Sequence, residues 1–217
     1  MKYSMEALGK SLLLYAVTDR QWLKGCSLES QIELALQGGC TMIQLREKSL
    51  SEDEFTAEAR SVAQLCHRYN VPLIINDNVS IAKAIDADGV HVGQGDMSPT
   101  EVRRILGADK IVGVSARTIE QAVLAEQQGA SYLGVGAVFG TTTKGDAKPI
   151  NLEMLRSICE SVSIPVVAIG GIASDNILQL SKTGISGVAV VSGIFAASDI
   201  ISASRHLRQL AEKVVGL

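Results

Sequence analysis

Eight short apolar runs, separated by segments with helical spacing, recur along the 217 residues of this chain. Most runs lack the strict alternation of a half-exposed strand, which is typical of parallel strands covered on both faces. The predicted strands are residues 12–18, 41–45, 72–75, 89–92, 110–114, 131–139, 164–169 and 187–191.

The intervening segments are rich in Ala, Leu, Glu and Gln, which favour helices. In the segment 118–129, Thr118 is a predicted N-cap and Gly129 ends the helix. The helices predicted in the same way are residues 27–39, 51–69, 118–129, 174–184 and 199–215.

Dividing 217 residues by eight units gives about 27 residues per unit, close to the roughly 30 residues of a strand–helix repeat. No linker or change of composition interrupts the series, so residues 1–217 are predicted to form one α/β domain, a single (β/α)8 TIM barrel. An open doubly wound sheet is the alternative. It usually carries a Gly-rich turn after the first strand, where this chain has Thr18-Asp19-Arg20.

Composition excludes several classes of function. The net charge of −3 gives no basic footprint for nucleic acid, and no apolar run approaches the ~18 residues of a membrane span. The four cysteines lack metal or redox spacing, so buried thiols in a cytoplasmic protein are expected. The expected partners are small-molecule substrates, with neither nucleic acid nor membrane, and a homo-oligomer stays open.

Polar residues follow several strands, at the end where barrel enzymes carry out their chemistry. Gln44, Arg46 and Lys48 are two residues apart and would share one face of an extended chain, where two cations suit a polyanion. The alternative is a solvated strand end whose cations pair with neighbours such as Glu47.

Two carboxylates follow neighbouring strands. Asp77 and Asp96, close to the amides of Asn76 and Gln94, match the way Mg²⁺ is held when a substrate phosphate completes its coordination. The alternative is that each carboxylate is the N-cap of the following helix.

The later strand ends carry features that suit an anion. Ser115 follows one strand and the run Thr141 to Lys144 follows the next, while Gly171 and Ser192 lie in the last two loops, where such barrels often bind phosphate. His91 lies within a strand, where a histidine bonded inside the barrel is favoured over a general base.

These strand ends together resemble those of the thiamine-phosphate synthase family. The resemblance rests on Gln44-Leu45-Arg46-Glu47-Lys48, Ile75-Asn76-Asp77, Asp88 to Gln94 with Asp96, Gly113-Val114-Ser115, Thr141 to Lys144, and Ile169-Gly170-Gly171-Ile172. It implies a (β/α)8 transferase that joins 4-amino-2-methyl-5-(diphosphooxymethyl)pyrimidine to 4-methyl-5-(2-phosphooxyethyl)thiazole and releases diphosphate.

The resemblance also implies roles for individual residues. Mg²⁺ would be held by Asp77 and Asp96, and the catalytic side chains would be Arg46, Lys48, Lys144 and Ser115. The pyrimidine diphosphate would be bound by Gln44, Leu45, Arg46, Glu47, Lys48, Asn76, Ser115 and Lys144. The thiazole phosphate would be bound by Thr141, Thr142, Thr143, Gly171, Val191 and Ser192. Asn78 departs from the family pattern, which often has a charged residue there.

Two alternatives to the synthase stay open. One is a paralogue without synthase activity, either a thiazole tautomerase or a regulatory protein that binds the thiazole phosphate. Such a protein would not need the cations and the carboxylate pair, all of which this chain has. The other is a barrel enzyme acting on a sugar or indole phosphate, which would share only the phosphate site of the last two loops.

Overall fold

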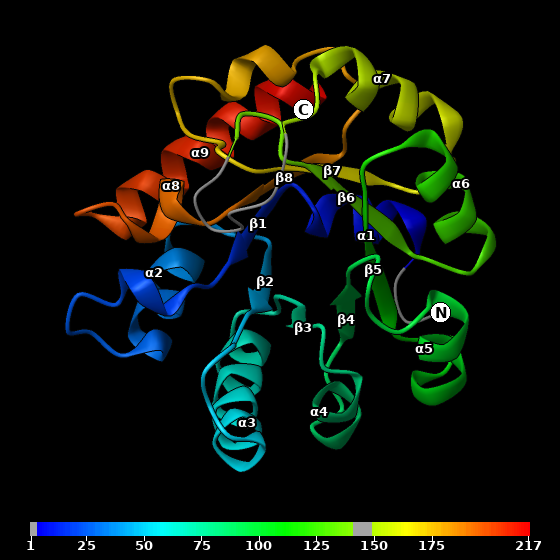
Figure 1. Ribbon diagram of the computed structural model, residues 1–217. Coiled ribbons are helices and arrows are strands. Elements are labelled where there is room, and N and C mark those ends of the chain that lie inside the picture. The colour runs from blue at the N-terminus through cyan, green and yellow to red at the C-terminus, as the bar shows by residue number, and fades with distance from the viewer. Residues whose placement is uncertain (1–3, 141–148) are drawn as a thin grey trace.

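The computed structural model describes residues 4–140 and 149–217, and in it eight parallel strands close into a barrel surrounded by helices (Figure 1). Each strand pairs with the next one in sequence, and β1 also pairs with β8 through Leu14 and Val188. The prediction of a (β/α)8 barrel is confirmed. The strands are β1 (Leu14–Val17), β2 (Met42–Leu45), β3 (Leu73–Asn76), β4 (Gly89–Val92), β5 (Ile111–Ala116), β6 (Tyr132–Gly136), β7 (Val166–Ile169) and β8 (Gly187–Val190).

The helices and short 3₁₀ turns of the described residues form the outer layer. They are α1 (Met5–Ser11), η1 (Arg20–Trp22), α2 (Leu28–Gln37), α3 (Glu52–Arg68), α4 (Val79–Ala84), α5 (Pro99–Leu106), α6 (Ile119–Gln127), α7 (Leu152–Ser161), η2 (Ile177–Leu180), α8 (Ser192–Phe195) and α9 (Ile200–Val215). Capping boxes at Ser51 and Ser98 satisfy the first amides of α3 and α5.

The strands bury both of their faces, which explains their continuous apolar runs. Along β2, Met42 points into a cluster inside the barrel, while Ile43 and Leu45 pack in the layer between strands and helices. Leu8 of α1, a helix that the sequence did not predict, joins the interior cluster before the first strand begins. The interior is therefore apolar at the end where the strands begin, and its polar residues gather at the other end.

The helix predicted at 174–184 is wrong, because the described chain there forms only the short turn η2. Asn176 accepts from the amide of Ala173 and donates to the carbonyl of Gly171, which ties this segment to the end of β7 instead of capping a helix. Lys182 and Gly184, with φ of 65° and 87°, then turn the chain out of helical geometry.

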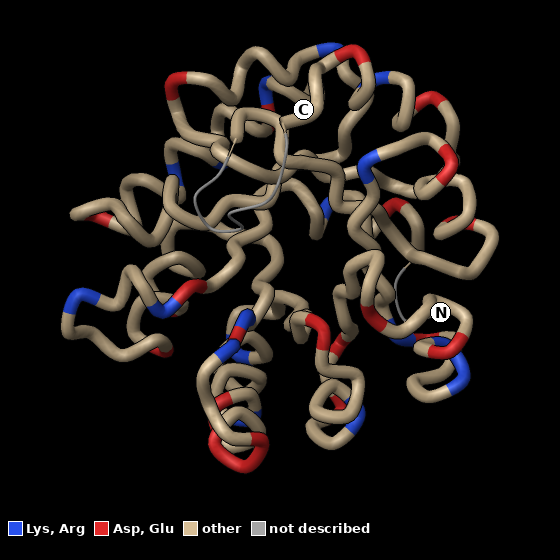
Figure 2. The backbone as a smooth tube through the Cα atoms, in the orientation of Figure 1, with Lys and Arg blue, Asp and Glu red and all other residues tan. Residues whose placement is uncertain are grey.

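The cysteines and the charged residues are only partly as expected. Cys40 and Cys66 are buried, and burial raises the pKa of each thiol to about 12, but Cys26 is exposed and Cys159 half-buried, so the expectation of buried thiols is wrong for these two. Acidic and basic residues are mixed around the ring of helices (Figure 2). Among the described helices, none combines the length and the apolar character that a membrane crossing requires.

Candidate active site

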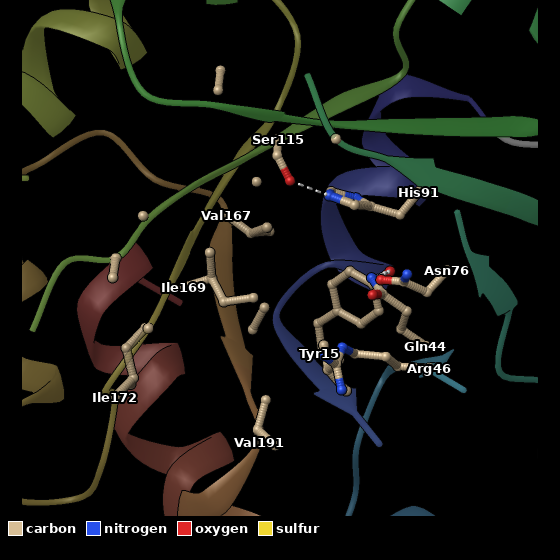
Figure 3. Close-up of a pocket in the computed structure, with 18 of the residues that line it drawn as sticks. Tyr15, Gln44, Arg46, Asn76, His91, Ser115, Val167, Ile169, Ile172 and Val191 are labelled. Atoms are coloured by element: carbon tan, nitrogen blue, oxygen red, sulfur yellow. Dashed lines mark hydrogen bonds between the residues drawn. The ribbon is translucent and has the colours of Figure 1, made fainter. Parts of the chain in front are cut away.

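A cavity of about 300 Å³ opens inside the barrel at the carboxyl ends of the strands. We call it the inner cavity. In Figure 3, the polar side chains on one side of it are labelled Gln44, Arg46 and Asn76, and the apolar side chains on the other are labelled Val167, Ile169 and Val191. Among the predicted site residues, those that line the inner cavity are Gln44, Arg46, Asn76, Ser115, Gly171, Val191 and Ser192.

A second hollow, the outer hollow, lies beside the ends of β2, β3 and β4. The predicted site residues that line it are Glu47, Lys48, Asn76, Asp77 and Asp96. Asn76 borders both spaces, so the inner cavity and the outer hollow adjoin. The structure thus brings most of the described candidates to one mouth of the barrel.

Leu45 is the described candidate that lies apart from both spaces. Its side chain is fully buried among the residues that pack strands against helices, because alternation along β2 turns it outward between Gln44 and Arg46. Thr141, Thr142, Thr143 and Lys144 lie outside the described residues.

The cations after β2 pair with aspartates rather than with Glu47. Arg46 Nη1 lies 3.3 Å from Asp19 Oδ2, and Lys48 Nζ lies 2.6 Å from Asp77 Oδ2. The loop between β2 and α3 carries basic and acidic side chains in turn, as Figure 2 also shows.

Glu47 organises the backbone of this loop. Its carboxylate accepts from Arg20 and from the amides of Lys48 and Ser49, at 2.6 and 2.7 Å. Burial acts to raise the pKa of Glu47, but the hydrogen bonds from Arg20 and the two amides outweigh it and hold the pKa below its usual value. The ionised carboxylate fixes the turn that carries Lys48.

Asp77 and Asp96 are not the N-caps of the helices that follow them. Asn78 caps α4 and Ser98 caps α5. Asp77 instead adopts a φ of 60°, which is unfavourable for most residues, and its amide donates to the carbonyl of His91 at 2.8 Å. Asp96 Oδ2 accepts from the amide of Gly93 at 2.7 Å.

This donor set fits Mg²⁺. Carboxylate oxygens are hard ligands, and Mg²⁺ is usually held by one or two carboxylates together with substrate phosphates and water. Among residues 4–140 and 149–217, no group of three or more His, Cys, Asp or Glu side chains forms a complete metal cage. Asp77 and Asp96 therefore suit a metal whose coordination a substrate completes.

Two buried polar atoms at this mouth lack a hydrogen-bond partner within the described part of the chain. They are Arg46 Nε and Asn76 Nδ2. Leaving a buried donor unsatisfied costs about 1–3 kcal/mol, so both atoms point to an acceptor that arrives with a ligand.

The sequence did not identify several residues that shape the site. Tyr15 lines the inner cavity from within an apolar strand, and Asp19 pairs with Arg46. Gln94, whose amide the sequence had placed near the two carboxylates, donates through Nε2 to the carbonyl of Ser115 at 2.7 Å. The place of Tyr15 within a predicted strand was one available signal. The prediction that His91 is bonded inside the barrel is confirmed by its contacts with Tyr132 and Ser115.

A (β/α)8 barrel with cations, carboxylates and unsatisfied donors around one mouth has the arrangement of a barrel enzyme, whose site lies at the carboxyl ends of the strands. The comparisons with known proteins identify the family. The family model described as thiamine monophosphate synthase matches residues 14–194. The chain belongs to this family, and it is an enzyme of the transferase class.

Individual relatives agree with this family. The thiamine-phosphate synthase of Ruminiclostridium cellulolyticum is 51% identical over 197 residues, which cover 91% of this chain and 94% of the relative. That of Clostridium acetobutylicum is 49% identical over 200 residues, covering 92% and 95%. The solved thiamine phosphate pyrophosphorylase of Pyrococcus furiosus superposes with a TM-score of 0.89 at 41% identity, covering 96% of this chain and 100% of that one.

Proposed function

We propose that this enzyme joins 4-amino-2-methyl-5-(diphosphooxymethyl)pyrimidine to 4-methyl-5-(2-phosphooxyethyl)thiazole in a Mg²⁺-dependent reaction that yields thiamine phosphate and diphosphate. The observation that carries the proposal is the pair of unsatisfied donors, Arg46 Nε and Asn76 Nδ2, beside two carboxylates at one mouth.

The reaction is a dissociative substitution. The bond between the pyrimidine methylene carbon and the diphosphate oxygen breaks, and both electrons leave with diphosphate. The thiazole nitrogen then donates its lone pair to the carbon and forms the new C–N bond. No strong base is needed, and the carboxylates at this mouth are assigned to ion pairs and to Mg²⁺ rather than to proton transfer.

The side chains of this enzyme stabilise the charge that builds on the departing diphosphate. Arg46 offers a planar set of donors and Lys48 a point charge, and Lys144 is proposed from the sequence to add a third cation. Asp77 and Asp96 would hold Mg²⁺, which when bound supplies further positive charge to the diphosphate oxygens. Gln44, Asn76 and Ser115 would bind the pyrimidine half, together with the backbone at Leu45 and Glu47.

The thiazole phosphate is proposed to lie at the opposite side of the mouth. Gly171, Val191 and Ser192 line the inner cavity there, and Thr141, Thr142 and Thr143 are assigned to the same phosphate from the sequence. At Gly171, where φ is 67°, a Cβ atom would lie 2.2 Å from the carbonyl oxygen of Gly140, so only glycine lets these two loops approach. The close approach leaves backbone amides near the ligand.

A mixture of the two phosphorylated compounds with the purified enzyme and Mg²⁺ tests the proposal directly. Diphosphate release is expected to need both compounds and to stop when a chelator removes the metal. A thiazole tautomerase or a regulatory binding protein would release no diphosphate, and that result would contradict the proposal.

A further inference from the structure

A chain of hydrogen-bonded side chains crosses the barrel interior beneath the inner cavity. Gln44 Nε2 donates to Tyr15 Oη at 2.7 Å, and Tyr15 Oη lies 2.8 Å from Tyr132 Oη. Tyr132 Oη lies 2.9 Å from His91 Nδ1, and His91 Nε2 lies 2.9 Å from Ser115 Oγ, the contact drawn in Figure 3. The chain therefore links two proposed substrate-binding residues, Gln44 and Ser115.

The strands leave room for this chain by carrying glycine where barrel interiors usually carry bulky residues. A Cβ atom at Gly113 would lie 2.2 Å from Tyr132 Cζ and 2.5 Å from His91 Nδ1. One at Gly134 would lie 3.0 Å from His91 Cε1. Neither ring could keep its place beside a larger residue at Gly113.

The hydrogen bond from Gln44 sets the donor-to-acceptor direction along this chain of hydrogen bonds. An amide NH₂ group only donates, so Tyr15 accepts from Gln44, and its own hydroxyl proton is left available to donate to Tyr132. Burial raises the pKa of both phenols, so each keeps that proton. When Tyr15 donates to Tyr132, the Tyr132 hydroxyl is directed to donate to His91 Nδ1, and in that arrangement Nδ1 carries no proton.

The hydrogen bond between His91 Nε2 and Ser115 Oγ determines whether the Ser115 hydroxyl can donate to a ligand. A neutral imidazole with a bare Nδ1 carries its proton on Nε2 and donates it to Ser115 Oγ. The hydroxyl proton of Ser115 finds no acceptor within the described part of the chain, and Ser115 lines the inner cavity. Gln94 holds the Ser115 carbonyl at 2.7 Å, which fixes the backbone as well.

We propose that Tyr15, Tyr132 and His91 are positioning residues that make Ser115 a hydrogen-bond donor to a ring nitrogen of the pyrimidine substrate. The acceptor is an uncharged heteroaromatic nitrogen, because a hydroxyl that accepts from a neutral imidazole is an uncharged donor and the facing wall, which includes Val167 and Ile169, suits a flat ring. This inference rests on the proposed function.

The first test measures the protonation of His91 in the ligand-free enzyme. The side chain ¹⁵N spectrum of the histidine-labelled protein reports which ring nitrogen carries the proton, and variants lacking the exposed His67 and His206 assign the signals. The expected result is a proton on Nε2 and a bare Nδ1. A proton on Nδ1, or on both nitrogens, would mean that the chain does not run toward Ser115 and would overturn the inference, whatever the activity of the enzyme.

The second test uses Tyr132→Phe, which keeps the ring and removes the donor to His91. The KM for the pyrimidine substrate is expected to rise roughly tenfold, as for the loss of one hydrogen bond, while the KM for the thiazole phosphate changes less than twofold. The same variant should lose the fixed Nε2–H form of His91. The matched control is Tyr69→Phe, which removes a hydroxyl bonded to Glu33 outside the barrel. Equal changes in both KM values, or an unchanged imidazole spectrum, would contradict a positioning role.

Discussion

The inner cavity and the outer hollow meet at Asn76 but hold their polar groups in different ways. In the outer hollow, charge is balanced by charge, as in the contact of 2.6 Å between Lys48 and Asp77. In the inner cavity Arg46 pairs with Asp19, whereas in the interior beneath it hydroxyl, amide and imidazole groups satisfy one another, and Tyr132 is buried without any charged partner among the described contacts. Exposed ion pairs are weak and exchange partners easily, whereas a satisfied buried network is rigid.

The comparison suggests that the inner cavity and the outer hollow have different roles in substrate binding. The outer hollow can release Lys48 toward an arriving diphosphate, because this side chain is half-exposed and its ion pair costs little to open. The inner cavity presents donors whose direction is set before the substrate arrives, which avoids reorganisation during the reaction. The predictions below test each of these roles.

The largest effect is expected from removing a charge of the outer hollow. Asp77→Asn should lower kcat by about 10²–10³-fold or more, because it removes a proposed Mg²⁺ ligand while asparagine keeps the left-handed backbone. Activity measured over a range of Mg²⁺ concentrations checks this prediction. Asp86→Asn is the matched control, since Asp86 has a similar φ of 55° and lies at the opposite end of the strands. Full activity in Asp77→Asn would remove the metal site from the account.

A smaller effect is expected from crowding the buried interior beneath the inner cavity. Gly113→Ala should destabilise the fold by about 1–3 kcal/mol, because its Cβ would overlap the rings of Tyr132 and His91. Gly134→Ala is the matched control and should cost less, since its Cβ would lie 3.0 Å from a single ring atom. Denaturant unfolding of both variants measures the difference. Equal stability would show that the interior is not packed tightly around this chain.

The smallest effect concerns the loop that carries Lys48. The lowered pKa of Glu47 means that its ionised form stabilises the fold above its unfolded pKa of about 4.5, and that this contribution disappears as the pH falls through the lower folded pKa. Glu47→Gln should therefore cost about 1–2 kcal/mol at pH 7 and less at pH 4.

Glu58→Gln provides a control of opposite sign for Glu47. Glu58 also pairs with Arg20, but burial raises its pKa, so its ionised form is the less favoured one in the fold and stability falls as the pH rises through that range. Unfolding curves between pH 4 and pH 7 give the free energy of unfolding of each variant relative to the unsubstituted enzyme. As the pH rises, this difference should change in one direction for Glu47→Gln and in the opposite direction for Glu58→Gln. Parallel changes would mean that the pairing around Arg20 does not control this loop.

The fold could be predicted because both faces of every strand are buried, which makes the apolar runs easy to recognise. The segment at 174–184 could not, because Asn176 bonds to Gly171 and Ala173 of its own loop, and composition does not reveal that competition. The strand-end candidates of β2 to β5 came from the alternation of side chains and from the family resemblance, and most of them meet at one mouth.

The hydrogen-bond chain was less visible in the sequence. Tyr15 and Tyr132 lie in strands that look uniformly apolar, and their hydroxyls meet only because residues 117 positions apart face each other across the barrel. Gly113 and Gly134 leave space for the rings, but the sequence alone does not show that these rings are Tyr132 and His91.

Calorimetric titration of Arg46→Ala with each ligand alone tests the proposed separation of the diphosphate site from the thiazole phosphate site most directly. Inorganic diphosphate with Mg²⁺ should bind about 10- to 100-fold more weakly than to the unsubstituted enzyme, as expected for a lost hydrogen bond to a charged group, while the thiazole phosphate should bind within twofold. A greater loss for the thiazole phosphate, or an unchanged affinity for Mg²⁺-diphosphate, would contradict the account.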